Sequence, residues 1–196
     1  AAAKQPAPGG GSVSALCGAL AASMSEMSAN FTTGKEKYAS VQDEITEALG
    51  KLKDRREKLL RLVDEDATAY RAVSEAYSMP RDTEEEKRRR KAAIQDALKG
   101  AMDVPLRIMR HCAEISRIAH RLVNVANPNL LTDVGVSAVL AEAACAAARF
   151  NVEINLGLIK DEGATGGVTE EIDRLSGVAS RLRAEVEAAV SEHLAE

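Results

Sequence analysis

The chain has 196 residues and a net charge of −4 at pH 7, with 45% hydrophobic and 29% charged residues, which is typical of a globular protein with a sizeable core. We treat residues 1–196 as a single domain, and the negative charge argues against nucleic acid as the main partner. Only 3% of the residues are aromatic and none is tryptophan, which favours closely packed helices over a β-sheet.

The first predicted feature is a turn with the sequence Pro6-Ala7-Pro8-Gly9-Gly10-Gly11-Ser12. Its prolines restrict the backbone, and its glycines permit positive φ and the close approach of a ligand or another part of the chain. Ser12 is expected to cap the helix that follows. The free N–H groups of that helix start suit an anionic or electron-rich ligand. The alternative is a tight helix entry packed beneath a neighbour.

Five long helices are predicted, over 12–31, 37–77, 82–125, 132–159 and 169–194. Their apolar residues recur in alternating steps of three and four, which is the period of helix bundles. Long helices with short connections predict an antiparallel all-α bundle. The first and fourth helices carry many small residues on their inner faces, which favours close helix crossing and subunit pairing.

Two features of the third predicted helix are relevant to its local structure and to possible function. Pro105 lies on its buried stripe and is expected to kink the helix and to free the carbonyl group near Ala101. His111 and His120 flank the same stripe, where a boundary position is favoured over a catalytic role. The loop 161–168 is rich in glycine and is expected to be a flexible connector.

The cysteines Cys17, Cys112 and Cys145 lie far apart and form no metal-binding spacing, so we expect no metal site and a reducing, cytoplasmic location. Residues 12–31 are too polar for a membrane span, and no signal peptide is visible. These patterns predict no membrane association.

Two carboxylates are candidate catalytic groups. Asp66 falls on or beside an apolar helix stripe, where a buried carboxylate is suited to acid–base chemistry. Its alternative role is a structural ion pair with Arg56. Asp133 is the second candidate, and its alternative role is a helix cap or a first-turn carboxylate that complements the helix dipole.

Two further motifs are candidate binding elements. Asn151 and Asn155 are spaced i,i+4, so that both amides face one side of a helix and contact one ligand or form an interhelical hydrogen-bonded pair. The segment Gly34-Lys35-Glu36-Lys37-Tyr38 offers cations to an anionic tail. Its alternative role is an exposed capping segment.

Taken together, five motifs in this order resemble those of the cyclodeaminase/cyclohydrolase family: Pro8-Gly9-Gly10-Gly11-Ser12, Gly34-Lys35-Glu36-Lys37-Tyr38, Asp64-Glu65-Asp66-Ala67, Asn127-Pro128-Asn129-Leu130-Leu131-Thr132-Asp133 and Asn151-Val152-Glu153-Ile154-Asn155-Leu156. This family includes the C-terminal domain of formiminotransferase-cyclodeaminase and the stand-alone methenyltetrahydrofolate cyclohydrolases. The chain departs from the family at Glu36, where lysine is usual, and at Thr132, where serine is usual.

The resemblance implies an all-α homodimer that binds a tetrahydrofolate derivative near the glycine turn, with no cofactor beyond that substrate and no metal. The leading interpretation is a methenyltetrahydrofolate cyclohydrolase, which the single-domain length favours. The alternatives are a formiminotetrahydrofolate cyclodeaminase that releases ammonia, and a catalytically silent helical dimer that binds folate or acts as a scaffold.

The expected roles of the motif residues follow from their chemistry. Asp133 or Asp66 is the expected catalytic carboxylate. Asn151 and Asn155 are expected to position the pterin or the attacking water. The remaining predicted substrate-binding residues are those of the glycine turn, Pro8, Gly9, Gly10, Gly11 and Ser12, and those expected to meet the glutamate carboxylates, Lys35 and Lys37 with the neighbouring Tyr38.

Overall fold

The computed structural model describes residues 2, 4, 5 and 7–195. In this part of the chain every regular element is a helix, which confirms the predicted all-α class. The elements are α1 (Gly10–Asn30), the 3-10 helix η1 (Glu36–Val41), α2 (Gln42–Ser78), α3 (Glu84–Val125), the 3-10 helix η2 (Pro128–Leu130), α4 (Leu131–Leu156), α5 (Glu162–Thr165) and α6 (Val168–Ala195).

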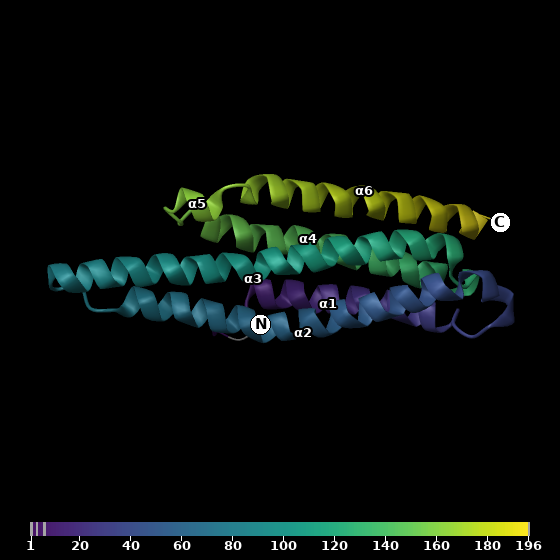
Figure 1. Ribbon diagram of the computed structural model, residues 1–196, viewed down its shortest axis with the longest axis horizontal. Helices are drawn as coiled ribbons and strands as arrows, with labels where there is room; N and C mark the ends of the chain where they lie inside the picture. Colours follow the sequence, from purple (N-terminus) through teal and green to yellow (C-terminus); the bar gives the residue numbers. More distant parts are fainter. Residues whose placement is uncertain (1, 3, 6, 196) are drawn as a thin grey trace.

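The five long helices lie side by side along one axis (Figure 1). α1 packs against α2, α3 and α4, and α6 covers the opposite side of α3 and α4. α1 and α4 run antiparallel, since Gly10 lies beside Asn151 and Ser25 beside Ser137. The turn that joins α2 to α3 extends beyond the start of α1 (Figure 1). The groove between α2 and α4 is therefore filled by α1 along most of its length and is open beyond Gly10.

Small residues allow α1 to approach its neighbours closely. A Cβ atom at Gly18 would lie 3.0 Å from the Cys112 Sγ atom and 3.2 Å from the Leu59 Cδ1 atom, so a larger residue would push these helices apart. Ala15 and Ala22 are fully buried in the same interface. The predicted close crossing of alanine-rich helices is confirmed.

Several helix boundaries differ from the predictions. Ser12 does not cap α1, because the helix begins at Gly10 and the residue at the cap position is Gly9. α4 begins at Leu131 after the short helix η2, so that Asp133 lies in its first turn. The start of α3 is as predicted, since Thr83 and Glu86 form a reciprocal capping box.

Two predicted breaks contain regular structure. α3 continues through Pro105 from Glu84 to Val125. The loop 161–168 contains the single-turn helix α5, whose first N–H groups donate hydrogen bonds to the Asp161 side chain.

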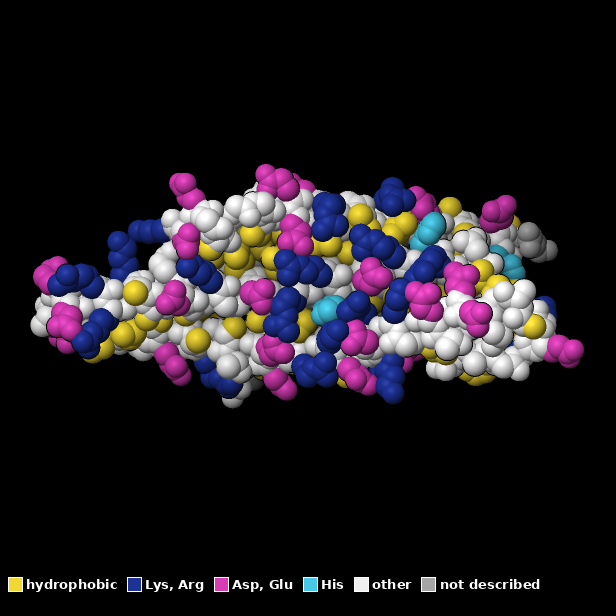
Figure 2. Space-filling model, in the orientation of Figure 1, with side chains coloured by type: hydrophobic (Ala, Val, Ile, Leu, Met, Phe, Trp, Pro, Cys, Tyr) yellow, Lys and Arg dark blue, Asp and Glu magenta, His cyan; other side chains and the backbone are white. Residues whose placement is uncertain are grey.

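The surfaces of the bundle differ in character. The face formed by α2, α3 and α6 carries closely mixed acidic and basic side chains (Figure 2). By contrast, the segment Pro128–Leu156, which includes α4, is long and apolar enough to cross a membrane by length and composition, with a mean hydropathy of 1.6. Of its most apolar stretch of 18 residues, 44% is buried inside the bundle. Its packing against α1, α3 and α6 explains part of that apolar character.

Candidate active site at the start of helix α1

A pocket of about 310 Å³ lies where the groove between α2 and α4 opens beyond the start of α1. α3 forms its floor with Leu98 and Ala101. Its other lining residues are Gly9, Gly10 and Gly11 at the start of α1, Asp66, Ala69, Tyr70, Val73 and Tyr77 from α2, and Asn151, Ile154, Asn155 and Leu158 from α4 and the residues after it. The fold thus brings together three of the five predicted motifs.

Asp66 is held at this pocket by the first turn of α1. Its Oδ2 atom accepts a hydrogen bond from the Ser12 backbone N–H, and the Ser12 Oγ atom also lies 2.8 Å from Oδ2. The Ser12 Oγ atom lies 3.0 Å from the Val63 carbonyl oxygen as well, so its single proton is shared between two acceptors. Among the described residues, both hydrogen bonds to the Asp66 carboxylate go to Oδ2 and none goes to Oδ1, which leaves Oδ1 for a ligand.

The glycines are needed for close approach rather than for an unusual backbone conformation. A Cβ atom at Gly11 would lie 2.0 Å from Asp66 Oδ1, and one at Gly10 would lie 3.3 Å from the Asn151 amide atoms. The positive φ that these glycines permit is not used, because Gly9 has a φ of −106° and the next two glycines are helical. Pro8 precedes them with a cis peptide bond, and Pro6 lies outside the described residues.

Asn151 and Asn155 both line the pocket, and one of them also has a structural role. The Asn155 Nδ2 atom donates to the Ala101 carbonyl oxygen at 3.2 Å and to the Asn151 carbonyl oxygen at 2.8 Å. Pro105, four residues after Ala101, has no N–H to satisfy that carbonyl. The predicted free carbonyl group is therefore the acceptor of an interhelical hydrogen bond at the edge of the site.

The predicted alternative role of Asp66, an ion pair with Arg56, is wrong. Arg56 Nε donates to Glu26 Oε1 at 2.7 Å, and its Nη2 atom donates to Glu26 Oε2 at 3.2 Å. That pair joins α2 to the middle of α1. Among the residues that the structure describes, Asp66 has no cationic partner of this kind and instead contacts the start of α1.

Sequence reasoning missed the aromatic wall of the pocket. Tyr70 and Tyr77 follow the apolar stripe of α2, yet they are 48% and 46% exposed. They line the pocket because α1, which covers the earlier part of that stripe, begins only at Gly10. Their spacing of seven residues places them on the same helix face as Asp66. The spacing of Tyr70 and Tyr77 from Asp66, together with a helix start opposite Asp66, could have indicated from the sequence that these tyrosines line the site.

The other predicted binding residues lie at the opposite end of α1. The Tyr38 hydroxyl donates to the Asn127 Oδ1 atom at 3.3 Å, and the exposed Lys35 and Lys37 ammonium groups lie 5.9 Å from the Phe31 ring centre and 5.4 Å from the Tyr38 ring centre. α1 spans 21 residues, which separates this cluster from the pocket by about 30 Å at the helical rise of 1.5 Å per residue.

Asp133 belongs to that distant end as well. It lies 18 positions before Asn151 on α4, or about 27 Å along the helix axis. It is half-buried in the first turn of α4 and does not line the Asp66 pocket. Within one chain, the two candidate carboxylates therefore cannot contact the same substrate atoms.

The histidines and cysteines lie away from the pocket. Burial lowers the pKa of His111 to about 4, and Arg55 and other nearby cations add to this effect. His120 Nε2 lies 2.8 Å from Glu185. Burial raises the pKa of the Cys145 thiol to about 12. Among the described residues, no three histidine, cysteine, aspartate or glutamate side chains gather in a way that would hold a metal ion.

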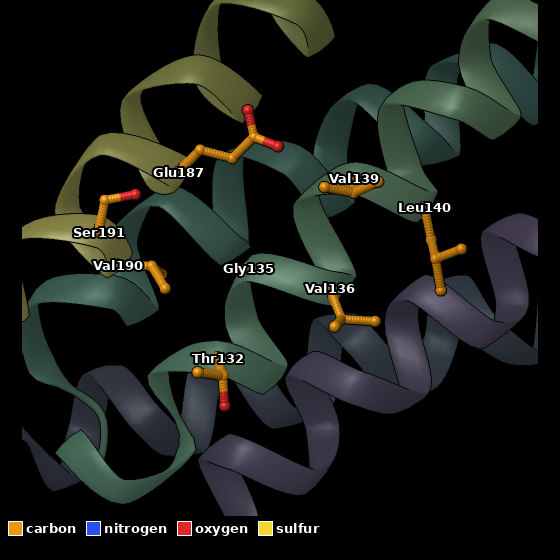
Figure 3. A pocket seen from close by; sticks show the side chains of 8 residues that line it. All are labelled: Thr132, Gly135, Val136, Val139, Leu140, Glu187, Val190 and Ser191. Atoms are coloured by element: carbon orange, nitrogen blue, oxygen red, sulfur yellow. The ribbon is translucent and has the colours of Figure 1, made fainter. Parts of the chain in front are cut away.

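A second pocket of about 540 Å³ lies between α4 and α6 (Figure 3). Val136, Val139, Leu140 and Val190 give it an apolar lining, with Glu187 at its edge. Figure 3 shows no convergence of polar side chains on a common point, in contrast to the Asp66 pocket. We therefore place the candidate active site at Asp66.

Comparison with known proteins identifies the family. The sequence profile of the formiminotransferase-cyclodeaminase family matches residues 1–174. The chain belongs to this family. It is 36% identical over 177 residues to a methenyltetrahydrofolate cyclohydrolase of Methylorubrum extorquens, covering 90% of this chain and 85% of that protein.

Two other members show the range of the family. The formimidoyltransferase-cyclodeaminase of Mus musculus is 33% identical over 160 residues, which cover 82% of this chain and 30% of the mouse protein. The crystal structure of a formiminotetrahydrofolate cyclodeaminase from Thermotoga maritima superposes with a TM-score of 0.88 at 30% identity, covering 98% of this chain and 92% of that one. The relatives are named as enzymes, and their folate-related names agree with the resemblance seen in the motifs.

Proposed function

We propose that this chain is a methenyltetrahydrofolate cyclohydrolase, which hydrolyses 5,10-methenyltetrahydrofolate to 10-formyltetrahydrofolate. The observation that carries the proposal is the Asp66 pocket, where α1 holds one carboxylate oxygen and the other accepts no hydrogen bond from the described residues. Similarity over most of both chains to a relative with this name supports the same activity.

The pocket has the groups that this reaction requires. The methenyl group of the substrate is a delocalised cation that bridges N5 and N10, and a carboxylate beside it stabilises that charge. Water attacks the bridging carbon while Asp66 Oδ1 accepts a proton from the water. Protonated Asp66 then returns its proton to N5 as the bond between the carbon and N5 breaks, and the hydroxyl group of the adduct loses its proton to solvent as it becomes the formyl carbonyl. The formyl group remains on N10, and one proton is released overall.

The remaining lining residues suit a flat heterocycle with polar edges. Tyr70 and Tyr77 offer aromatic faces to a cationic ring system. The Asn151 and Asn155 side chains offer amide oxygens at the opposite wall, while the Asn155 amide nitrogen is already bonded to α3. We infer that the pterin lies between these two walls, and that neither a metal nor another cofactor is needed.

The test is the decay of methenyltetrahydrofolate absorbance with purified protein in the presence of a chelator. Asp66→Asn is expected to slow turnover by about 10²–10⁴-fold, the range for a general acid–base group. Asp64→Asn is the matched control, because Asp64 is exposed on the same helix two residues away and is expected to leave turnover unchanged. Equal activity of both variants and the wild type would contradict the role of Asp66.

The cyclodeaminase activity is the second candidate, and the Thermotoga maritima structure favours it. Release of ammonia from formiminotetrahydrofolate, with slower turnover of the methenyl compound, would assign this activity instead. Folate binding without either reaction would support the silent binding module.

We further propose that the protein is a homodimer. Val13, Leu16 and Leu20 on α1 are 50%, 46% and 52% exposed, and Val136 and Phe150 on α4 are 46% and 71% exposed. Exposed apolar side chains that gather on the neighbouring helices α1 and α4 mark an interaction surface. A monomer mass by light scattering at the concentration of the assay would contradict this proposal.

A further inference from the structure

A further pocket, of about 350 Å³, lies between α2 and α3, and we call it the basic pocket. Its lining side chains come from these two helices and are Lys58, Arg61, Glu65, Arg107, Arg110 and His111. Residues spaced three or four apart share one side of a helix, so each helix presents its three lining residues to the same groove. None of these six residues belongs to α1 or α4, so a homodimer formed through those two helices leaves the basic pocket open.

Positive charge outweighs negative charge within this lining. Four of the six side chains are lysine or arginine and one is glutamate, although the whole chain carries a net charge of −4. Figure 2 shows basic side chains around a histidine in the middle of the face formed by α2, α3 and α6. Like charges that are held close together repel one another, and a cleft lined by one sign of charge attracts ions of the opposite sign.

Carboxylates hold two of the arginines in place without using all of their donors. Glu65 accepts a hydrogen bond from Arg107 Nη1 at 2.7 Å. Glu171 of α6 accepts hydrogen bonds from Arg110 Nε and Nη2, both at 2.8 Å. A guanidinium group has five N–H donors, so each of these arginines is fixed in position and still has N–H groups that these bonds do not use.

Two other lining side chains have no such partner. Among the described residues, neither Arg61 nor His111 makes a hydrogen bond or an ion pair. One turn before Lys58 on α2, the Nε atom of Arg55 is buried and also lacks a hydrogen-bond partner. Unsatisfied donors of this kind are few in native proteins, and each calls for an explanation. An anion bound in the basic pocket would supply acceptors for them.

The electrostatic environment of His111 points the same way. Burial lowers its pKa to about 4, the cations Arg55, Lys58 and Arg107 lower it further, and Asp54 opposes them. The imidazole is therefore neutral at pH 7 and lies between cations of α2 and of its own helix. A bound anion would offset the repulsion among these cations and would favour the protonated imidazole, which is a hydrogen-bond donor at both nitrogens.

A phosphate group matches these donors better than a carboxylate does. A carboxylate offers two oxygens and one charge, and Glu65 and Glu171 already occupy one side of Arg107 and Arg110 in that way. A phosphate group offers at least three acceptor oxygens and up to two charges, which suits donors that converge from two helices. The volume of about 350 Å³ is larger than a single phosphate ion needs, which leaves room for a small esterified group.

We propose that the basic pocket between α2 and α3 binds a phosphate group, either free phosphate or the phosphate of a small phosphomonoester, with the unpaired Arg61 as its principal contact. This site is separate from the Asp66 pocket, because the two pockets lie on different sides of α2. Glu65 pairs with Arg107 of α3, whereas the next residue, Asp66, contacts Ser12 of α1. The inference therefore does not depend on the proposed reaction.

The test is isothermal titration calorimetry of the purified chain at low salt, with inorganic phosphate and, separately, with glycerol 3-phosphate. At about pH 7.5 both probes carry close to two negative charges. We expect saturable binding to the wild type. Arg61→Gln should weaken this binding at least about tenfold, because it removes a charge-assisted contact. Its melting temperature without the anion should equal that of the wild type, since Arg61 makes no hydrogen bond or ion pair with the described residues.

Arg81→Gln is the matched control. Arg81 is exposed in the turn between α2 and α3, and α2 continues for 17 residues from Arg61 to its end at Ser78, which is roughly 25 Å at the helical rise. This substitution changes the net charge by the same amount as Arg61→Gln, so it should reproduce any effect of overall charge. We expect the Arg81→Gln variant to bind both probes as tightly as the wild type.

A second measurement follows His111 by nuclear magnetic resonance as the pH is lowered. Sulfate serves as the probe because it keeps its charge over this range. Saturating sulfate should raise the pKa of His111 in the wild type, and sulfate should therefore bind more tightly as the pH falls. The Arg61→Gln variant should lose most of this sulfate-dependent rise, whereas Arg81→Gln should keep it.

Each outcome has a definite meaning. Absence of saturable binding of both phosphate compounds to the wild type, or unchanged affinity in Arg61→Gln, would overturn the proposal. Equally tight binding of malonate, a dicarboxylate of similar charge, would overturn the assignment to phosphate. Tighter binding of glycerol 3-phosphate would support the proposal with an ester as the ligand, and tighter binding of inorganic phosphate would support it with the free ion.

Discussion

The contact between Gly11 and Asp66 provides a sharp test of how the site is built. Gly11→Ala places a Cβ atom 2.0 Å from Asp66 Oδ1 and 2.6 Å from its Cγ atom, whereas ordinary contact begins at 3.4 Å. Asp66 must therefore move away from the start of α1. The movement disrupts the hydrogen bond from the Ser12 N–H to Oδ2, which is 2.8 Å long in the wild type.

Two opposing effects set the magnitude. Loss of a hydrogen bond to a charged group costs about 1.5–3 kcal/mol. Alanine in place of glycine within a helix contributes about 0.5–1 kcal/mol of stability. The net loss in the free energy of unfolding is about 1–2 kcal/mol, which lowers the melting temperature by roughly 2–8 °C in a chain of this size. Displacement of a catalytic group by about 1 Å costs on the order of 10²-fold in rate.

Gly50→Ala is the matched control. Gly50 lies within α2, and no atom lies within 4 Å of its added Cβ, so this variant should gain stability of about 0.5–1 kcal/mol and keep full activity. Circular dichroism gives the melting temperatures, and methenyltetrahydrofolate absorbance gives the rates. If Gly11→Ala is as stable and as active as Gly50→Ala, the inferred contact between the glycine turn and Asp66 is wrong.

Three further predictions concern groups around the site. Asn155→Ala should lower the free energy of unfolding by about 1 kcal/mol in chemical denaturation, because it leaves the Ala101 carbonyl without its hydrogen bond. The loss should be smaller in a Pro105→Ala background, because alanine at position 105 restores a backbone N–H donor for that carbonyl. Burial lowers the pKa of His111 from 6.5 to about 4. Between pH 6.5 and pH 4 the unfolded chain therefore binds more protons than the folded chain, and the free energy of unfolding decreases as the pH falls through this range. The expected decrease is about 1 kcal/mol after solvent screening. Melting curves of His111→Gln should lack this part of the pH dependence, and an unchanged slope would remove His111 as its source. Burial raises the pKa of Cys145 to about 12, so this thiol should react with a maleimide only on unfolding, and rapid labelling of the native protein would contradict its burial.

The sequence by itself determined the local features of the fold. Apolar residues in steps of three and four specify helices, and Thr83 with Glu86 specifies the start of α3, because these interactions involve residues within one or two turns. The consequence of Pro105 for the Ala101 carbonyl was predicted for the same reason. The family motifs were also recognisable from the sequence alone.

Only the tertiary structure decided which of these groups meet. Arg56 contacts Glu26 rather than Asp66, and Asp66 contacts Ser12, across separations of 30 and 54 residues that no helical period encodes. Tyr70 repeats the pattern of a core residue, yet it is exposed because its neighbour α1 starts too late to cover it. A hydrophobic stripe shows which face of a helix is apolar, but the length and position of the opposing helix decide how much of that face is buried and how much is left to form a pocket.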